Sequence, residues 1–250
     1  MIKFLLLVLI TFNVSANQID ERCPSNVLWQ APISIDGNNQ YLCRTAYAVN
    51  YNYKTKTPFY VLEHITSQHI IKNSIRKNNF REDYEIPIQF RSTLKDYASA
   101  DYDRGHLGAA GNFTYDKTVM SESFLLSNMM PQDYNNNRRI WNMLEQHVRD
   151  LVGKFSEVYV ITGTIYGSGY KNIGKGVGVP TEIYKIIIDP KNLRAIAFRF
   201  PNAPIDPKFM SNYVVSVKSI EDTTGINFSP KIPDNLKHLE VDVATYSSWF

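Results

Sequence analysis

Apolar and polar residues alternate over residues 41–53 of this chain, which is the pattern of a β-strand. We predict strands over 41–53 and 59–65, joined by a turn at 54–58 into a hairpin. Further strands are predicted at 124–132 (a short strand leading to a loop), at 157–162, and as a hairpin of 181–189 with 193–200. The remaining segments are expected to be irregular over 66–102, a glycine-rich excursion over 163–178, and a helix or extended segment followed by a strand over 207–221.

One stretch has a helical period instead. The residues that recur at spacings of three and four are Ile140, Trp141, Leu144, Val148 and Leu151. They predict an amphipathic helix over 138–152 with one buried stripe. The run Asn135-Asn136-Asn137 suits a turn and the helix N-cap. The length allows a single α/β or α+β domain, and the chain shows neither a repeat nor a linker that would indicate a second domain.

The chain begins with a pattern typical of a secretory signal. Lys3 gives a positive start, residues 4–14 are almost wholly apolar, and Val14-Ser15-Ala16 is a small-residue cleavage site. We therefore expect a signal peptide over 1–16 and a single mature domain over 17–250. Export to the periplasm or the extracellular space follows from this interpretation. No other apolar stretch is long enough for a membrane helix, so no membrane association is expected.

Composition and cysteines add two constraints. The 250 residues are 44% hydrophobic and 20% charged, and the formal charge of +3 permits a polyanionic partner without requiring one. Cys23 and Cys43 are expected to pair in an oxidising compartment. The pair would tie the N-terminal arm to the first strand and contribute roughly 3 kcal/mol by restricting the unfolded chain.

The candidate chemistry begins with Asp103-Arg104-Gly105-His106. The glycine lets another part of the chain approach closely, and the charged neighbours can orient and tune the imidazole. A neutral histidine is a general base, an asparagine oxygen suits Mg²⁺, and an arginine steadies charge on phosphate. Together with Asn137 and the acid–arginine pair Glu145 and Arg149, this set fits metal-assisted phosphodiester hydrolysis. The alternative is a structural role, in which His106 is a surface histidine in a polar turn and the other residues are helix caps or surface groups.

A cluster of positive charges lies upstream, at Lys72, Arg76, Lys77 and Arg81. It is either a solvated loop or a rim that contacts phosphates.

These residues form a specific combination. Asp103-Arg104-Gly105-His106 is followed by Ser127-Asn128, by Pro131-Gln132, and by Asn137, Trp141, Leu144, Glu145 and Arg149 at fixed spacing. The match continues upstream at 79–83 and downstream at 179–180, 197–202 and 224–228, and so spans most of 41–233. In this pattern the chain resembles the DNA/RNA non-specific endonuclease family, which implies an α+β fold. The resemblance implies a ββα-metal nuclease fold, with a central, mainly antiparallel sheet and flanking helices.

The resemblance also implies residue roles. His106 would be the general base, and Asn137 would be the direct protein ligand of Mg²⁺, with Mn²⁺ as an alternative. Glu145 would hold metal-bound water, Arg149 would support Glu145 and the phosphate, and Asn128 would position His106 or the phosphate. Arg104 would brace the site, and Asp103 would be structural. The products would carry 5′-phosphate ends.

The sequence departs from the family pattern in two places. The residue after Asn137 is usually glutamine, but here it is Arg138, followed by Arg139. Some members have an arginine where this chain has Asn78-Asn79. Arg81, Arg138 and Arg139 are candidate phosphate contacts, and the choice between Arg76 and Arg81 at the scissile phosphate stays open.

Asn137 and Glu145 are eight residues apart, about 12 Å along a straight helix, so both cannot ligate one ion directly. We therefore expect Asn137 at the cap before the helix and Glu145 acting through water.

The resulting hypothesis is a secreted Mg²⁺-dependent endonuclease that cleaves DNA and RNA with little sequence specificity. The alternatives are a non-catalytic nucleic-acid-binding protein, or a phosphodiesterase for small substrates, on the same fold. The resemblance also allows a homodimer, whereas the preference between DNA and RNA and the biological role stay open.

Overall fold

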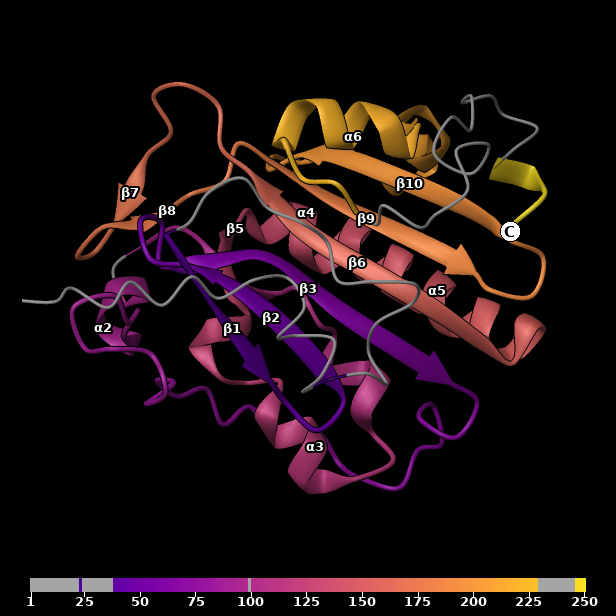
Figure 1. The fold of residues 1–250 in the computed structure, drawn as a ribbon, viewed down its shortest axis with the longest axis horizontal. Helices are drawn as coiled ribbons and strands as arrows, with labels where there is room; N and C mark the ends of the chain where they lie inside the picture. The colour runs from indigo at the N-terminus through magenta and orange to yellow at the C-terminus, as the bar shows by residue number, and fades with distance from the viewer. Residues whose placement is uncertain (1–22, 24–37, 99, 229–245) are drawn as a thin grey trace, which may run out of the picture.

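Seven antiparallel strands form the central sheet of the computed structural model, which describes residues 23, 38–98, 100–228 and 246–250 (Figure 1). Their order is β1-β2-β3-β6-β9-β10-β11. The strands are β1 (Asn39–Cys43), β2 (Tyr47–Asn52), β3 (Thr57–Thr66), β6 (Glu157–Ile165), β9 (Glu182–Asp189), β10 (Arg194–Pro201) and β11 (Val214–Val215). The expected signal peptide over 1–16 lies outside the described residues.

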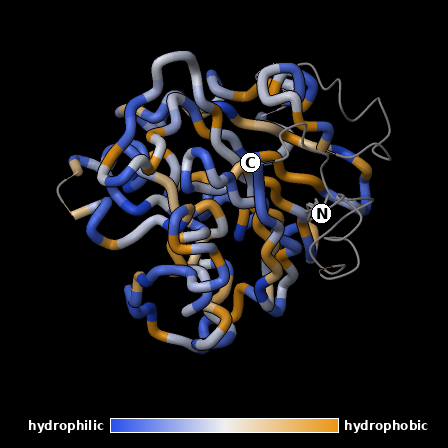
Figure 2. The backbone as a smooth tube through the Cα atoms, turned by 60° about the vertical axis from the view of Figure 1, so that its left-hand side comes forward, coloured by the Kyte–Doolittle hydropathy of each residue, from blue (hydrophilic) through white to orange (hydrophobic). Residues whose placement is uncertain are grey.

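The sheet separates two hydrophobic cores, because successive side chains of a strand point to opposite faces. On β6, Val160 packs into the core beneath α5 (Asn142–Phe155), whereas Ile161 faces the core on the side of α6 (Val217–Thr224). Figure 1 shows α5 behind the sheet and α6 in front of it. Hydrophobic segments accordingly run through the middle of the molecule in Figure 2. The α+β class and the mainly antiparallel sheet are therefore confirmed.

A separate two-stranded hairpin with a long connection leads into the longest helical segment. Strand β4 (Asp103–His106) pairs antiparallel with β5 (Met129–Gln132), so that His106 lies opposite Met129. The chain then continues through α4 (Tyr134–Asn136), a π-helical turn (η4, Asn137–Trp141) and α5. The order strand, strand, helix is the ββα arrangement that the resemblance implied.

The helical segment begins earlier than the predicted residue 138. Its N-cap is Asp133, whose carboxylate accepts a hydrogen bond from the Asn136 amide at 2.9 Å. The expectation that Asn137 caps the helix is therefore wrong, because Asp133 already satisfies the free amide and Asn137 lies inside the segment.

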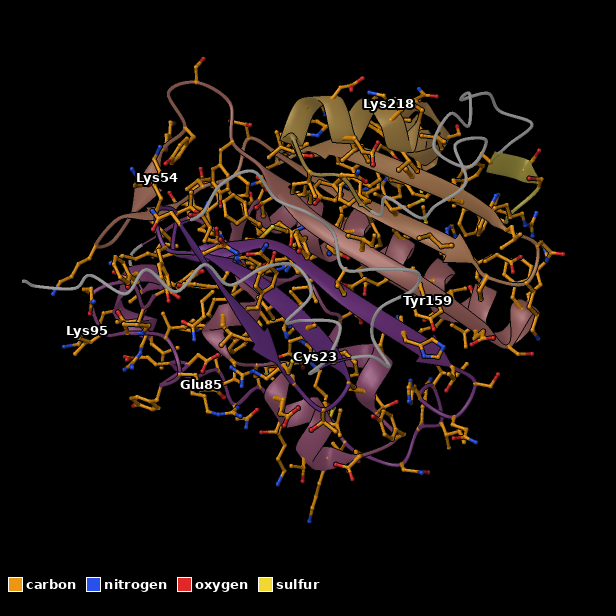
Figure 3. All side chains as sticks on the ribbon, viewed as in Figure 1. Cys23, Lys54, Glu85, Lys95, Tyr159 and Lys218 are labelled. Atoms are coloured by element: carbon orange, nitrogen blue, oxygen red, sulfur yellow. A yellow bond between two sulfur atoms is a disulfide. The ribbon has the colours of Figure 1, made fainter. Side chains whose placement is uncertain are left out.

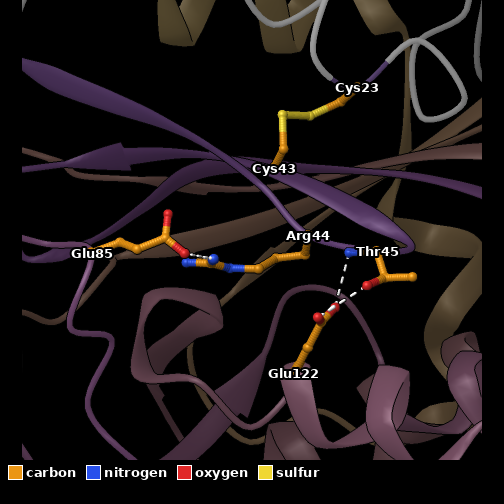
Figure 4. The surroundings of a disulfide bond; sticks show 6 residues. All are labelled: Cys23, Cys43, Arg44, Thr45, Glu85 and Glu122. Carbon is orange, nitrogen blue, oxygen red and sulfur yellow. Dashed lines mark hydrogen bonds and ion pairs between the residues drawn. A yellow bond between two sulfur atoms is a disulfide. The ribbon is translucent and has the colours of Figure 1, made fainter.

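The predicted strand over 41–53 is also divided, into β1 and β2. Arg44 turns the chain by donating its amide to the Tyr47 carbonyl at 2.8 Å. Thr45 donates its amide and hydroxyl to the Glu122 carboxylate, 2.9 and 3.0 Å away, while the Arg44 guanidinium pairs with Asp83 and Glu85 (Figure 4).

The predicted disulfide is present. Cys23 is bonded to Cys43 at the end of β1, so a residue of the N-terminal arm is joined to the first strand (Figure 4).

The remaining elements are short. They are α2 (Leu94–Tyr97), α3 (Lys117–Glu122), the 3-10 turns η2 (Ala110–Phe113), η3 (Leu126–Asn128) and η5 (Pro207–Tyr213), and the small hairpin of β7 (Asn172–Ile173) with β8 (Val177–Gly178). Of these, α2 lies in the segment expected to be irregular, and β7 and β8 lie in the glycine-rich excursion. Charged side chains such as Lys54, Lys95 and Lys218 point outward (Figure 3). Within the described ranges, no helix has the length and apolarity needed to cross a membrane.

Candidate active site

His106 ends β4 and is held there from two sides. The preceding Gly105 is required, because a Cβ atom at this position would lie 2.1 Å from Oε1 of Gln132 on β5. The His106 carbonyl accepts a hydrogen bond from the Trp141 indole of η4 at 3.4 Å. The predicted close approach at Gly105 is thus present, and the hairpin fixes the histidine against the helical segment.

A cleft of about 430 Å³ opens between the hairpin, the helical segment and the segment over 76–80. Its lining includes His106, Arg104, Asn137, Arg138 and Glu145, which the sequence had singled out for chemistry. The other residues that line it are Arg76, Asn78, Phe80, Asp103, Ala110 and Asn142.

The His106 imidazole is 8% exposed and lies among aromatic rings. Its ring centre is 5.6 Å from that of Phe80 and 5.0 Å from that of Phe124. Burial, with the charges of Arg76 and Arg104, lowers the pKa of His106 to about 3. The imidazole is therefore neutral at pH 7, and its Nε2 atom has no hydrogen-bond partner among the described residues.

Asp103 organises the side chains opposite the histidine. Its carboxylate accepts hydrogen bonds from the Asn137 amide at 2.9 Å and from two guanidinium nitrogens of Arg138 at 2.9 and 2.7 Å. Burial alone would raise its pKa, but the hydrogen bonds from Arg138 and Asn137 hold the pKa of Asp103 below its ordinary value. Because the Asn137 nitrogen is used on Asp103, the amide oxygen is left as the ligand atom.

Glu145 reaches the same cleft from α5. Eight α-helical residues would leave Glu145 about 80° out of phase with Asn137. A π turn has more residues per turn, so η4 between them reduces this difference, and both side chains line the cleft. Burial raises the pKa of Glu145, and the charges of Lys185 and Arg149 oppose that shift.

A buried polar cluster lies behind Glu145 on the α5 face of the sheet. Glu63 on β3 and Lys185 on β9 flank β6, and each is 1% exposed. Lys185 donates to the Thr162 hydroxyl at 2.6 Å, and Glu63 accepts from the Asn112 amide at 2.9 Å. Burial raises the pKa of Glu63 to about 7, against the opposing charge of Lys185.

Arg149 belongs to this cluster and does not line the cleft. Its guanidinium donates to the oxygens of Asn112 at 3.3 Å and Gln146 at 3.1 Å. It therefore acts on Glu145 through its charge, as expected, but a phosphate in the cleft would not meet it directly.

Asn128 also lies outside the lining. Its oxygen accepts from the Gly108 amide, and its nitrogen donates to the carbonyls of Gly108 and Ser123, all at 2.9 Å. The side-chain amide bonds only backbone groups, so Asn128 holds the segment that follows His106, and a role in positioning His106 or the phosphate stays a prediction.

Two of the three candidate phosphate contacts are absent from the lining. Arg81 donates to the Ser121 carbonyl at 2.7 Å, which directs its guanidinium to α3, and Arg139 is exposed outside the cleft. Arg138 does line the cleft, and so does Arg76. The structure thus favours Arg76 over Arg81 near the scissile phosphate.

The residues present fit a hard divalent cation. An amide oxygen with its nitrogen engaged, a half-buried carboxylate and an open cleft suit Mg²⁺, which keeps several waters and takes few protein ligands. Across the described parts of the chain, no group of three or more His, Cys, Asp and Glu side chains is placed to hold a metal. The fit therefore rests on Asn137 and Glu145.

Sequence reasoning missed the cluster around Glu63 and Lys185. A signal was present, because both charged residues interrupt apolar strands at positions where alternation directs their side chains to the buried face. Asn112 carried no comparable signal, since a lone asparagine in a loop is ordinary.

Comparisons with known proteins agree with this geometry. A sequence model described as DNA/RNA non-specific endonuclease matches residues 25–235. The chain is 35% identical to mitochondrial nuclease EXOG of Danio rerio over 75% of its own length, and 33% identical to human mitochondrial endonuclease G over 81%. It spans 60% of the length of that EXOG and 73% of that endonuclease G.

A solved structure gives the same result. A chain of the EndoG/EndoGI complex, whose crystal structure addresses the mechanism of EndoG inhibition, matches with a TM-score of 0.75 and 32% identity. The match covers 81% of this chain and 92% of the other. The expected ββα-metal nuclease fold is thereby confirmed.

The expectation of export is contradicted. The EXOG and endonuclease G relatives are mitochondrial nucleases by name, so they do not support a periplasmic or extracellular location.

Proposed function

Since the chain belongs to the DNA/RNA non-specific endonuclease family, we propose that it is a metal-dependent endonuclease that hydrolyses phosphodiester bonds of DNA and RNA with little sequence specificity. The proposal treats residues 17–250 as one nuclease domain. It also includes Mg²⁺ as the working metal, products with 5′-phosphate ends, and a homodimer as the assembly.

The observation that carries the proposal is the neutral His106, which lines a cleft together with Asn137 and whose buried Nε2 has no hydrogen-bond partner among the described residues. A general base must be unprotonated and must have a free nitrogen next to the reacting water. His106 would take the proton of the attacking water at Nε2, while Phe80 and Phe124 hold the ring in place.

Asn137 would hold the metal directly and Glu145 would hold it through water. When bound, the metal would neutralise charge on the phosphate and stabilise the leaving 3′ oxygen. Asp103 would keep the Asn137 oxygen directed to the ion, which makes Asp103 a positioning residue. Lys185 and Arg149 would favour the charged form of Glu145.

The cations around the cleft would bind the phosphate. Arg76 and Arg104 each lie over an aromatic ring, with guanidinium carbons 5.3 Å from the Phe124 centre and 4.2 Å from the Phe80 centre. These contacts fix the charges near His106 without neutralising them. An added negative charge between them would be stabilised in the pentacovalent transition state.

Cleavage of supercoiled plasmid and of RNA, in Mg²⁺ and in EDTA, tests the function. Wild type should degrade both substrates in Mg²⁺ only, and Asn137→Ala should lose at least about a hundredfold in rate while it still folds. Degradation that persists in EDTA, or an Asn137→Ala protein as active as wild type, would refute the proposed metal role.

A further inference from the structure

An exposed aromatic ring stands at the rim of the cleft. Tyr134 is the first residue of α4 and is 49% exposed. Arg138, one helical turn later, places its guanidinium carbon 5.8 Å from the centre of the Tyr134 ring. Because Arg138 also lines the cleft, the ring lies next to a residue of the cleft wall.

Arg138 is held in that place by its ion pair. Two guanidinium nitrogens are bonded to Asp103, which itself holds Asn137. The geometry next to the Tyr134 ring is therefore coupled to the candidate metal ligand.

A second pair of the same kind lies on a neighbouring element. Phe209 on η5 is 47% exposed, and the ammonium of Lys208 is 4.8 Å from its ring centre. Element η5 packs against η4, the turn that carries Arg138. Asp206 pairs with Lys208 at 3.3 Å, and the charge of Arg139 acts on Asp206. Tyr134, Arg138, Lys208 and Phe209 are called the aromatic rim below.

We propose that the aromatic rim binds the unpaired nucleobases that flank the scissile phosphate in single-stranded DNA or RNA. Exposed rings next to cations are the chemistry of single-strand binding, because every base has a face to stack and every nucleotide has a phosphate. In a duplex these faces are covered by neighbouring base pairs, so the rim would favour unpaired strands. This inference rests on the proposed function, since the cleft must hold the phosphate.

The consequence is a difference between substrates, which a purely electrostatic rim would not produce. Removal of one stacking ring is expected to weaken single-strand binding by about 5- to 150-fold. Duplex binding depends mainly on phosphate contacts and should change less than about twofold.

The test measures the dissociation constant of a fluorescent single-stranded oligonucleotide and of a hairpin duplex of the same sequence. All proteins carry His106→Ala to prevent cleavage. Tyr134→Ala and the double variant Tyr134→Ala with Phe209→Ala should lose single-strand affinity, and Tyr134→Phe should keep it. Tyr134→Leu keeps apolar area but removes the ring, so it should resemble Tyr134→Ala.

Tyr84→Ala is the matched control. Tyr84 is also an exposed tyrosine next to an arginine, with the Arg91 guanidinium carbon 4.6 Å from its ring centre, but it does not line the cleft. It should bind both oligonucleotides as the parent does.

The inference is overturned if Tyr134→Ala binds the single strand as the parent does, or if both oligonucleotides weaken equally. It is also overturned if Tyr134→Leu retains full affinity, because a general contact surface would then suffice, as for a protein partner. The fate of the proposed function is read separately from wild-type cleavage in Mg²⁺. If the Tyr134 variants selectively lose single-strand binding but wild type does not cleave in Mg²⁺, the inference about the aromatic rim holds and the proposed nuclease function is refuted.

Discussion

Acidification should destabilise this protein through His106. The pKa of the buried imidazole is lowered to about 3, whereas in the unfolded chain it has its ordinary value of about 6.5. Between these values the unfolded chain binds a proton that the folded protein cannot accept. The contribution of His106 to stability is therefore fully present above about pH 6.5 and is lost as the pH falls towards 3.

The magnitude follows from the two pKa values. Each unit of difference corresponds to about 1.4 kcal/mol, so lowering the pH from 7 to 5 should remove about 2 kcal/mol of unfolding free energy through this residue alone. Carboxylates contribute their own pH dependence, so the value must be isolated by a difference between two proteins.

Urea unfolding of wild type and of His106→Asn, each at pH 7 and at pH 5, isolates the contribution of His106 to the unfolding free energy. Asparagine does not titrate, so wild type should lose about 2 kcal/mol more than the variant between the two pH values. His147→Asn is the control, because His147 is half-buried and its pKa is lowered less severely. Equal losses in wild type and His106→Asn would refute the buried, neutral imidazole and with it the proposed base.

Three further substitutions test the geometry. Gly105→Ala should lower the unfolding free energy by roughly 1–3 kcal/mol in urea titrations, because its Cβ would lie 2.1 Å from the Gln132 oxygen; an unchanged midpoint would contradict this close approach. Gly153→Ala should raise the thermal midpoint, with a gain of up to about 1 kcal/mol, since its Cβ meets open space in a helix interior; a loss would show strain there. Arg138→Gln should leave the thermal midpoint nearly unchanged because the ion pair is exposed, but should reduce the salt dependence of nucleic-acid affinity by about one phosphate contact; an unaltered slope would remove Arg138 from the phosphate site.

The sequence predicted those elements whose signals are local. The hairpin of β9 and β10 has apolar runs on both sides of the turn Pro190-Lys191-Asn192, and the structure has the same two strands. The break between β1 and β2 had no such signal, because it depends on Glu122, about 77 positions away, which bonds Thr45. Tertiary partners of this kind cannot be found from periodicity.

The helix boundaries show a similar contrast. The run of three asparagines predicted the N-cap, but Asp133, the better acceptor, caps the segment. At the other end the predicted helix stops at residue 152, but the observed helix continues to Phe155 and ends with Ser156 in the left-handed conformation at φ 75°. Backbone strain at a serine is invisible in a sequence.

The sequence motifs predicted some residues of the candidate site. The residues whose place depends on tertiary packing were missed. His106, Asn137 and Glu145, which the resemblance implied for the site, line one cleft. Asp103 was expected to be merely structural, yet it orients the candidate metal ligand. The role of Asp103 depends on the contact between β4 and the helical segment, and these two elements meet only in the folded chain.

Single-turnover cleavage of one end-labelled oligonucleotide by wild type and His106→Ala, at saturating protein in Mg²⁺ and in EDTA, tests the central claim most directly. Wild type should cut the strand in Mg²⁺ and leave 5′-phosphate ends, whereas His106→Ala should bind it equally well and leave it intact. A folded wild type that binds the strand but leaves it uncut in Mg²⁺, Mn²⁺ and Ca²⁺ would contradict the account and indicate a nucleic-acid-binding protein on a nuclease fold.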